Sequence, residues 1–151
     1  MKKLKKPKVV VDTNLIVSAL IRRGSPHKVL QAWSLNYFYL LVTQNLFAEI
    51  KMVLGRDWVR NKYGVEQKEI DNFIELIRLN AKFVAPIKIR DMPVHVRDVK
   101  DDMVLVCALG GEADYLVTGD RDLLELNDNF LLGNLKIVSP KTFLELLKNS
   151  K

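Results

Sequence analysis

Cysteine, histidine and tryptophan, which often take part in catalysis or ligand binding, are scarce in this 151-residue sequence. Cys107 is the sole cysteine, which allows neither an internal disulfide nor a cysteine-based zinc site. Nothing near Cys107 in the sequence would lower the pKa of its thiol, so we expect a buried core residue rather than a nucleophile. His27 and His95 are the only histidines, and both are expected to have surface roles. Trp33 and Trp58, both in predicted helices, are expected in the core rather than as base-stacking surfaces.

Long apolar runs are also absent. No run reaches the roughly 18–20 residues that a helix needs to cross a bilayer. The basic residues at the start resemble the beginning of a signal peptide, but the apolar run after them is short and is interrupted by Asp12 and Asn14. With 48% apolar and 28% charged residues, the composition is that of a globular chain. We therefore expect a cytoplasmic protein with no membrane segment.

Acidic residues are concentrated in one stretch of the chain. Residues 98–128 contain nine acids and two bases, whereas the rest of the chain contains 22 bases and nine acids. A basic surface attracts a polyanion, and a local acidic cluster repels one unless cations lie between them. This distribution suits an enzyme that holds nucleic acid and acts on it through a divalent metal. An unevenly charged, solvated surface would give the same distribution.

Short strands and helices alternate along the sequence. Apolar runs rich in β-branched residues predict strands at 8–11, 37–42, 82–85, 115–118 and 135–138. Helical periodicity predicts helices at 14–21, 25–33, 44–54, 56–63, 65–80, 100–109, 120–126 and 140–148. Ser25-Pro26 and Ser139-Pro140 each predict a helix start in which serine is the cap. The alternation predicts one α/β domain over residues 1–151, with a mostly parallel sheet between two layers of helices.

Carboxylates follow two of the predicted strands. Asp12 comes directly after the strand at 8–11, and Asp120 follows the strand at 115–118 after one glycine. Ligands of open α/β sheets bind beyond the carboxyl ends of the strands, so both side chains are expected at one edge. Glu49 lies at the border of the apolar stripe of the helix predicted at 44–54.

A further acidic group opens the helix predicted at 100–109. It consists of Asp98, Asp101 and Asp102. Asp101 shares a helix face with Leu105 and Ala108, which favours Asp101 over Asp102 as the acid that faces inward.

Each acid also has an ordinary structural interpretation. Helix capping is open to Asp12, Asp98, Asp120 and Asp122, and Glu49 could be a surface residue. Several carboxylates at one edge would, however, repel one another and raise their pKa values unless a cation neutralised them. Oxygen-rich sites suit Mg²⁺ or Mn²⁺. A metal held in this way can polarise a phosphate and activate water for phosphodiester hydrolysis.

Four segments resemble the motifs of PIN domains. Val-Val-Asp-Thr-Asn-Leu at 10–15 is similar to the opening motif, and Thr-Gln-Asn-Leu-Phe-Ala-Glu at 43–49 to the helix that carries the family's glutamate. Asp-Val-Lys-Asp-Asp at 98–102 resembles the third motif, although Val99 stands where the family commonly has proline. Val-Thr-Gly-Asp-Arg-Asp-Leu-Leu at 117–124 resembles the fourth and most specific motif. The resemblance is closest to the VapC-like toxins of prokaryotic toxin–antitoxin pairs.

The resemblance implies a five-stranded parallel sheet with helices on both sides and an Mg²⁺- or Mn²⁺-dependent endoribonuclease. It implies four acids that bind the metal and catalyse cleavage: Asp12, Glu49, Asp101 and Asp120. It further implies that the acids, or a metal-bound water, are oriented by Asn14, Thr118 and Asp122. RNA would be the substrate, a homodimer the common assembly, and a protein antitoxin the neutralising partner.

Three arginines are candidates for holding RNA. Arg22 and Arg23 lie in the loop near the first motif, and Arg56 follows the helix of Glu49. Each is either a phosphate contact or an ordinary surface arginine.

Two other functions stay open on the sequence alone. The first is a PIN domain that binds RNA or serves as a scaffold without cutting. The second is an aspartyl-phosphate protein, either a response-regulator receiver or a haloacid-dehalogenase-like phosphatase. A receiver needs an acid pair near the first strand and a lysine after the last, where this chain has Asp12 alone and Ser139-Pro140. The phosphatase needs a second aspartate where Asn14 stands.

Overall fold

Five short strands form the sheet of the structure, a computed structural model that describes residues 5–94 and 99–149 without the side chains of 99–101. The strands are β1 (Lys8–Val11), β2 (Tyr39–Val42), β3 (Lys82–Phe83), β4 (Tyr115–Val117) and β5 (Lys136–Val138). Neighbouring strands pair in parallel, and the order across the sheet is β3-β2-β1-β4-β5. The predicted five-stranded parallel α/β fold is confirmed.

Helices connect the strands. They are α1 (Thr13–Ile21), α2 (Ser25–Ser34), α3 (Gln44–Leu54), α4 (Asp57–Tyr63), α5 (Gln67–Asn80), α6 (Val99–Gly110), α7 (Arg121–Leu124) and α8 (Pro140–Asn149). Two single 3₁₀ turns, η1 (Ile89–Asp91) and η2 (Phe130–Leu132), lie in the longer connections. Within the described residues, no helix combines the length and the apolar composition that spanning a membrane requires.

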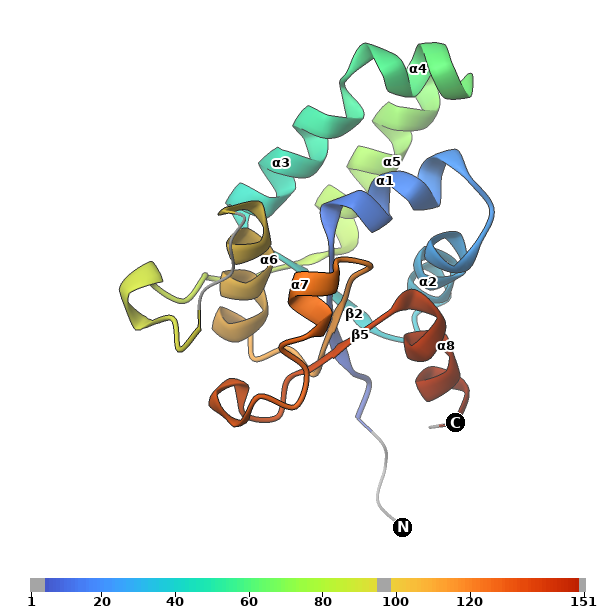
Figure 1. Cartoon of the computed structure of the whole chain (residues 1–151). Coiled ribbons are helices and arrows are strands. Elements are labelled where there is room, and N and C mark those ends of the chain that lie inside the picture. The colour runs from blue at the N-terminus through green and yellow to red at the C-terminus, as the bar shows by residue number, and fades with distance from the viewer. Residues whose placement is uncertain (1–4, 95–98, 150–151) are drawn as a thin grey trace.

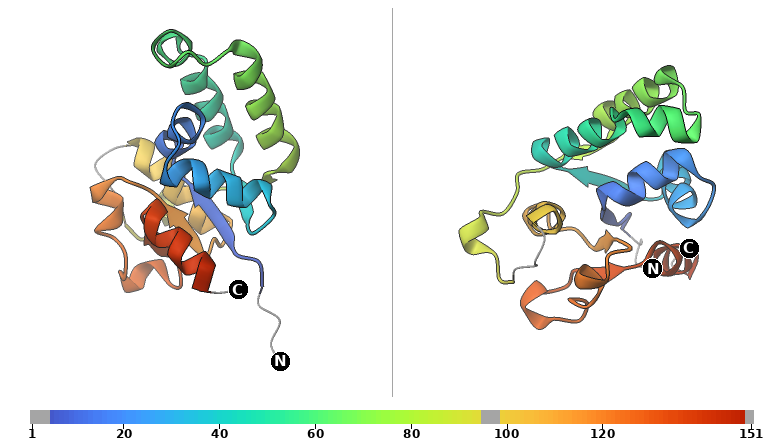
Figure 2. Two further views of the ribbon diagram at one scale, coloured as in Figure 1. Left: turned by 90° about the vertical axis from the view of Figure 1, so that its right-hand side faces the viewer. Right: turned by 45° about the horizontal axis from the view of Figure 1, so that its top comes forward.

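The sheet lies between two layers of helices (Figures 1 and 2). On one face α2 and α8 pack together, and Phe143 of α8 meets the rings of Phe38 and Tyr115 edge to face. From the other face α6 packs against β1, β2 and β4. The central strand β1 is therefore covered on both sides, and Val9, Val10 and Val11 are at most 1% exposed. A strand buried on both faces is apolar, as residues 9–11 of this one are.

The strand order reverses direction at β1. From β1 the chain moves outward to β2 and β3, and it then returns past β1 to place β4 and β5 on the other side. In the register of the central pair, Val11 lies opposite Val117, and the Asp12 amide donates to the Val117 carbonyl oxygen at 3.0 Å. In open α/β sheets the crevice at such a reversal is the usual place for a ligand.

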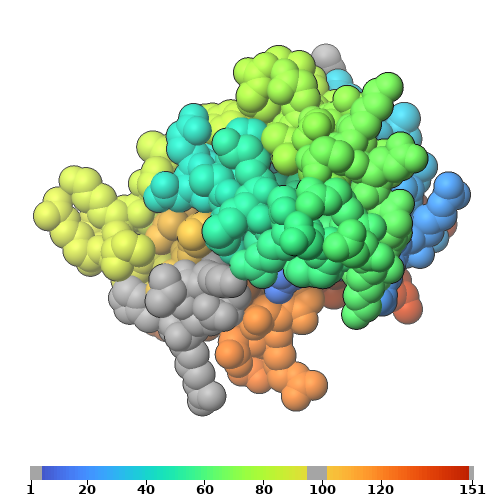
Figure 3. Space-filling model, turned by 90° about the horizontal axis from the view of Figure 1, so that it is seen from above, coloured from blue at the N-terminus to red at the C-terminus, as the bar shows by residue number. Residues whose placement is uncertain are grey.

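A helical arm of residues 44–80 stands over this crevice. It comprises α3, α4 and α5, and it extends beyond the carboxyl edge of the sheet above α1 (Figure 1). Figure 3 looks down on this end and shows the arm across from the orange segment that contains α7, with a small dark blue part of the chain recessed between them. The arm therefore supplies a second wall above the strand ends.

Gly110, the last residue of α6, lies against the chain that follows β3. A Cβ atom at this position would lie 2.2 Å from the carbonyl oxygen of Ala85 and 2.5 Å from the amide nitrogen of Ile87. One turn earlier, the Val106 carbonyl oxygen accepts a hydrogen bond of 3.0 Å from the Ile87 amide. The end of α6 is thus pressed against this segment at a distance that leaves room only for glycine.

We predict that Gly110→Ala lowers the free energy of unfolding by about 1–3 kcal/mol, because the added methyl group displaces backbone rather than a flexible side chain. Urea unfolding followed by circular dichroism measures the loss. Gly119→Ala is the matched control, since its nearest neighbour would be Leu15 Cδ2 at 3.8 Å, an ordinary contact. We expect a change of about 0.5 kcal/mol or less for the control. Equal losses in the two variants would contradict this account.

Candidate active site

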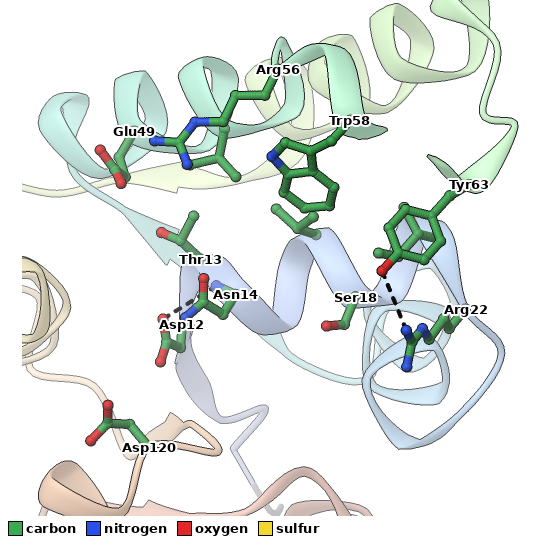
Figure 4. A pocket seen from close by; sticks show the side chains of 13 residues that line it. Asp12, Thr13, Asn14, Ser18, Arg22, Glu49, Arg56, Trp58, Tyr63 and Asp120 are labelled. Carbon is green, nitrogen blue, oxygen red and sulfur yellow. Dashed lines mark hydrogen bonds between the residues drawn. The ribbon is translucent and has the colours of Figure 1, made fainter. Parts of the chain in front are cut away.

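A hollow of about 500 Å³ opens at the carboxyl edge, between α1 and the helical arm. Three of the four predicted acids, Asp12, Glu49 and Asp120, line it. They come from the end of β1, from α3 and from the start of α7. Figure 4 shows Asp12 between Glu49 on the arm and Asp120 on the far side. The fold thus brings together acids that are far apart in the sequence.

Asp12 is the buried carboxylate of this hollow, with 8% of its surface exposed. It caps α1, and its Oδ1 accepts a hydrogen bond of 3.3 Å from the Asn14 amide. Its Oδ2 accepts one of 2.8 Å from the Thr118 hydroxyl. Burial raises the pKa of Asp12 most, the hydrogen bonds from Thr118 and from the backbone of Asn14 and Thr13 offset this only in part, and the charge of Asp120 raises the pKa by a smaller amount. Ionised Asp12 is therefore held where its charge is unfavourable.

Thr118 connects the two acids at the strand ends. Its buried hydroxyl donates to Asp12 and accepts a hydrogen bond of 3.0 Å from the Asp120 amide. Asp120 in turn caps α7, and its Oδ1 accepts hydrogen bonds of 2.8 Å from the Asp122 amide and 3.3 Å from the Leu123 amide. One hydroxyl thus fixes the side chain of one acid and the backbone of the other.

The remaining predicted positions differ in their relation to the hollow. Asn14 is exposed and lines it. Asp122 is exposed and does not line the hollow, and its backbone amide donates a hydrogen bond to Oδ1 of Asp120. Asp98 and the side chain of Asp101 lie outside the described residues. Asp102 lines a different hollow, together with Asn45 and Ile87.

The described acids do not form a compact metal cage. Among residues 5–94 and 99–149, apart from the side chains of 99–101, no three His, Cys, Asp or Glu side chains are grouped closely enough to hold an ion. Glu49 is partly buried on the arm, across the hollow from Asp12 (Figure 4). The acids therefore share one hollow, and the described ones alone do not complete a coordination sphere.

Capping and a role in the site turn out to be compatible. Asp12 and Asp120 both cap helices, as the structural interpretation required. In Asp120 the cap uses Oδ1 alone, and in the described part of the chain no donor is hydrogen-bonded to Oδ2. The capping bond fixes each carboxylate in orientation while one lone-pair direction or one oxygen still faces the hollow.

Two of the three candidate arginines line the hollow. Arg22, at the end of α1, and Arg56, at the start of α4, both contribute to it. Arg23 is exposed and is not a lining residue, so its candidacy for this site is not supported. Among the described residues no lysine or arginine forms an ion pair with Asp12 or Asp120.

Aromatic residues of the arm also line the hollow, and their presence there was not predicted from the sequence. Trp33 is buried in the core as predicted, but Trp58 is 39% exposed and lines the hollow beside Tyr63. The prediction that Trp58 belongs to the core is wrong. Because α4 lies over α1 rather than over the sheet (Figure 1), its Trp58 and Tyr63 face the crevice, while Val59 of the same helix is buried.

The comparison with protein families agrees with this geometry. The family model described as PIN domain matches residues 8–122, more than half of the chain. The chain belongs to the PIN domain family. Its fold is thus of a nuclease type, since PIN domains are generally nucleases and usually use divalent metals. No curated protein matches the chain.

We predict that Asp12→Asn stabilises the metal-free protein at neutral pH. The folded state raises the pKa of Asp12 above 3.8, so the stabilisation that the protonated acid provides is complete below that pH and is lost as the pH rises through the folded pKa. Asparagine keeps an oxygen for the Asn14 amide and does not titrate. Thermal melts in EDTA from about pH 4 to pH 7 should show a flatter decline for the variant.

Asp114→Asn is the control for this experiment. Asp114 is exposed at the start of β4, where its Oδ2 accepts a hydrogen bond from the Lys8 amide that asparagine can still accept. We expect the control to follow the wild-type pH profile. A variant at position 12 that matches the wild type near pH 4 and melts lower than it near pH 7 would show that the charge of Asp12 is stabilising instead.

Neither Cys107 nor His27 contributes to this hollow. Cys107 is fully buried in α6, and burial raises the pKa of its thiol to about 12. His27 is partly buried and forms a hydrogen bond of 3.1 Å between Nδ1 and the Ala19 carbonyl oxygen, and His95 lies outside the described residues. The thiol is therefore a core group, as the sequence predicted.

We predict that Cys107 resists a thiol-reactive dye in the folded protein at about pH 8, because it is both inaccessible and protonated there. Labelling followed by mass spectrometry should show modification only after guanidinium unfolding. Rapid labelling of the folded protein at the rate of the unfolded one would contradict the burial of this residue.

Proposed function

We propose that this PIN domain is a metal-dependent endoribonuclease that hydrolyses RNA phosphodiester bonds. The observation that carries the proposal is the placement of Asp12 and Asp120 at the strand-order reversal, joined through Thr118. A buried carboxylate beside a second one, with no basic side chain paired to either within the described residues, has the electrostatics of a cation site.

The donor set fits a divalent metal. Carboxylate oxygens suit Mg²⁺ and Mn²⁺, and a cation would offset the burial and, to a smaller extent, the charge of Asp120, which raise the pKa of Asp12. We propose that Asp12, Glu49, Asp101 and Asp120 are the acids that hold it. Asp101 is kept as the fourth acid because Asp102, its neighbour, faces another hollow. When bound, such an ion polarises the phosphate and lowers the pKa of a bound water.

The protein's own groups would then position the reaction. The Thr118 hydroxyl and the Asn14 amide hold the two oxygens of Asp12, and the α7 amides hold Oδ1 of Asp120. These hydrogen bonds fix both carboxylates before substrate arrives, so less reorganisation is needed when charge develops in the transition state. We propose that the Asn14 side chain and the Asp122 carboxylate help to orient the attacking water.

Arg22 and Arg56 are proposed to hold the phosphates of the RNA. They line the same hollow as the acids, and they belong to the basic part of the chain outside residues 98–128. Backbone contacts of this kind supply affinity without sequence preference.

The motif resemblance supports a finer proposal. By likeness to the VapC-like toxins, we propose that the protein acts in the cytoplasm as the toxin of a toxin–antitoxin pair. It would form a homodimer and be neutralised by a protein antitoxin.

A non-catalytic RNA-binding or scaffold PIN domain is the second candidate. One observation favours it: among the described residues no three acids are close enough to share an ion. The two candidates differ in the outcome of a cleavage assay.

We predict that the purified protein cuts a labelled RNA in Mn²⁺ or Mg²⁺ and not in EDTA. Asp12→Asn and Asp120→Asn should each lower the rate by at least about 100-fold, since each removes charge that the metal requires. Independently of activity, Mn²⁺ should raise the Tm of the wild type and leave that of Asp12→Asn unchanged.

Asp114→Asn serves again as control, because it lies at the opposite end of β4 from Asp120, and it should cut at the wild-type rate. Binding of RNA by the wild type and by Asp12→Asn without cleavage by either, in protein shown to be folded, would support the scaffold. Cleavage that persists in both variants at positions 12 and 120 would exclude the carboxylate mechanism.

A further inference from the structure

The hollow has two chemically different ends. The acids occupy the end at the strand termini, and Arg22, Trp58 and Tyr63 form the other (Figure 4). The floor between them is α1, along which Asn14 and Arg22 both line the hollow. At a rise of 1.5 Å per residue these two positions are about 12 Å apart. The hollow is thus an elongated trough with room for more than the group that reacts.

The aromatic end is built from residues that hold one another. The Trp58 and Tyr63 rings meet edge to face, with centroids 5.9 Å apart and planes at 71°. Arg22 donates from Nη2 to the Tyr63 hydroxyl at 3.3 Å, and its guanidinium lies 5.5 Å from the centroid of the Tyr63 ring. These contacts tie α4 to the end of α1 and fix the indole, which still exposes 39% of its surface.

We propose that Trp58 is a stacking platform for an unpaired nucleobase of the RNA. The proposal rests on the proposed function, because it places the base in the same trough as the phosphate that reacts. Nucleobases of any identity stack on an aromatic ring, and such stacking is a main source of affinity for single strands. A base inside a duplex has both faces covered by its neighbours, so the platform selects single-stranded over duplex RNA.

Arg56 supports this placement of the chain. In Figure 4 its guanidinium lies between Glu49 and Trp58, that is, between the acidic end and the platform. A strand whose base rests on Trp58 and whose reacting phosphate lies at the acids would pass its intervening backbone beside this cation. Acids, cation and aromatic ring thus follow one another along the trough. This is the order in which the strand would present its reacting phosphate, its intervening backbone and its stacked base.

A structural role for Trp58 is the alternative, because Val17 and Ile21 line the same hollow and the indole could serve only to cover them. Leucine would still cover these residues but offers no ring for stacking. Phenylalanine would cover them and also offers a ring. The two substitutions therefore separate the two roles.

Tryptophan fluorescence in EDTA tests the proposal without cleavage. The chain has two tryptophans, and Trp33 is buried, so a base that stacks on the protein quenches Trp58 alone. The probes are a single-stranded adenine ten-mer RNA, the same strand paired with its complement, and an abasic ten-mer that keeps the phosphates. We expect quenching by the first probe only.

Binding is then measured for Trp58→Leu and Trp58→Phe by anisotropy of the labelled adenine ten-mer. We expect Trp58→Leu to weaken binding about 10- to 100-fold and Trp58→Phe to retain most of the affinity. Phe130→Leu is the matched control, since Phe130 is 85% exposed on η2 and does not line the hollow, and it should bind as the wild type does. In cleavage, Trp58→Leu should raise KM with little change in kcat.

Unchanged affinity in folded Trp58→Leu, or equal quenching by the abasic strand, would overturn the proposal. If Trp58→Leu does not fold, a folded Trp58→Ser takes its place. Unimpaired binding by Trp58→Ser would overturn the proposal. Weakened binding by Trp58→Ser, together with near wild-type binding by Trp58→Phe, would support it. Failure of the proposed function gives a different result, namely base-dependent quenching with no metal-dependent cleavage. Failure of the stacking proposal alone leaves cleavage that depends on Asp12 and is indifferent to Trp58.

Discussion

The burial of a single negative charge at the end of β1 is the constraint on which this site depends. Asp12 is held under the helical arm, next to Asp120 and away from any basic partner in the described part of the chain. The sheet compensates in part, through the Thr118 hydroxyl and the Asn14 amide. The hydrogen bonds leave part of the cost of burying the negative charge uncompensated, and this charge attracts a cation. The same feature that weakens the metal-free fold thus provides the chemistry proposed for the site.

The strand ends of the site were predictable from the sequence, because their position follows from chain direction alone. A parallel sheet places the ends of β1 and β4 at one edge, so Asp12 and Asp120 had to be neighbours once the strands were recognised. Glu49 was found from its place beside the apolar stripe of α3, whose bounds were predicted without error. The strand at 82–85 was predicted too long, because only Lys82 and Phe83 pair with β2.

Features that depend on packing were not predictable in this way. Ser139 caps α8 as expected, with its hydroxyl accepting from the Thr142 amide, yet Ser25 lies inside α2 and Gly24 occupies its cap position. A local Ser-Pro signal cannot tell these cases apart, because the incoming direction of the chain decides them. Trp58 was misplaced for a similar reason. Its exposure depends on α4 standing over α1 rather than over the sheet, which no helical period reveals.

The pairing of β1 with β4 has a consequence for how the protein is made. Asp12 is synthesised 106 residues before its partner Thr118. A nascent chain therefore carries the first acid long before it carries the strand, the hydroxyl and the second acid that complete the edge. Assembly of the site must wait until β4 has left the ribosome and inserted beside β1. For the proposed ribonuclease, we expect a chain that ends before β4 to lack the sheet edge on which cleavage would depend.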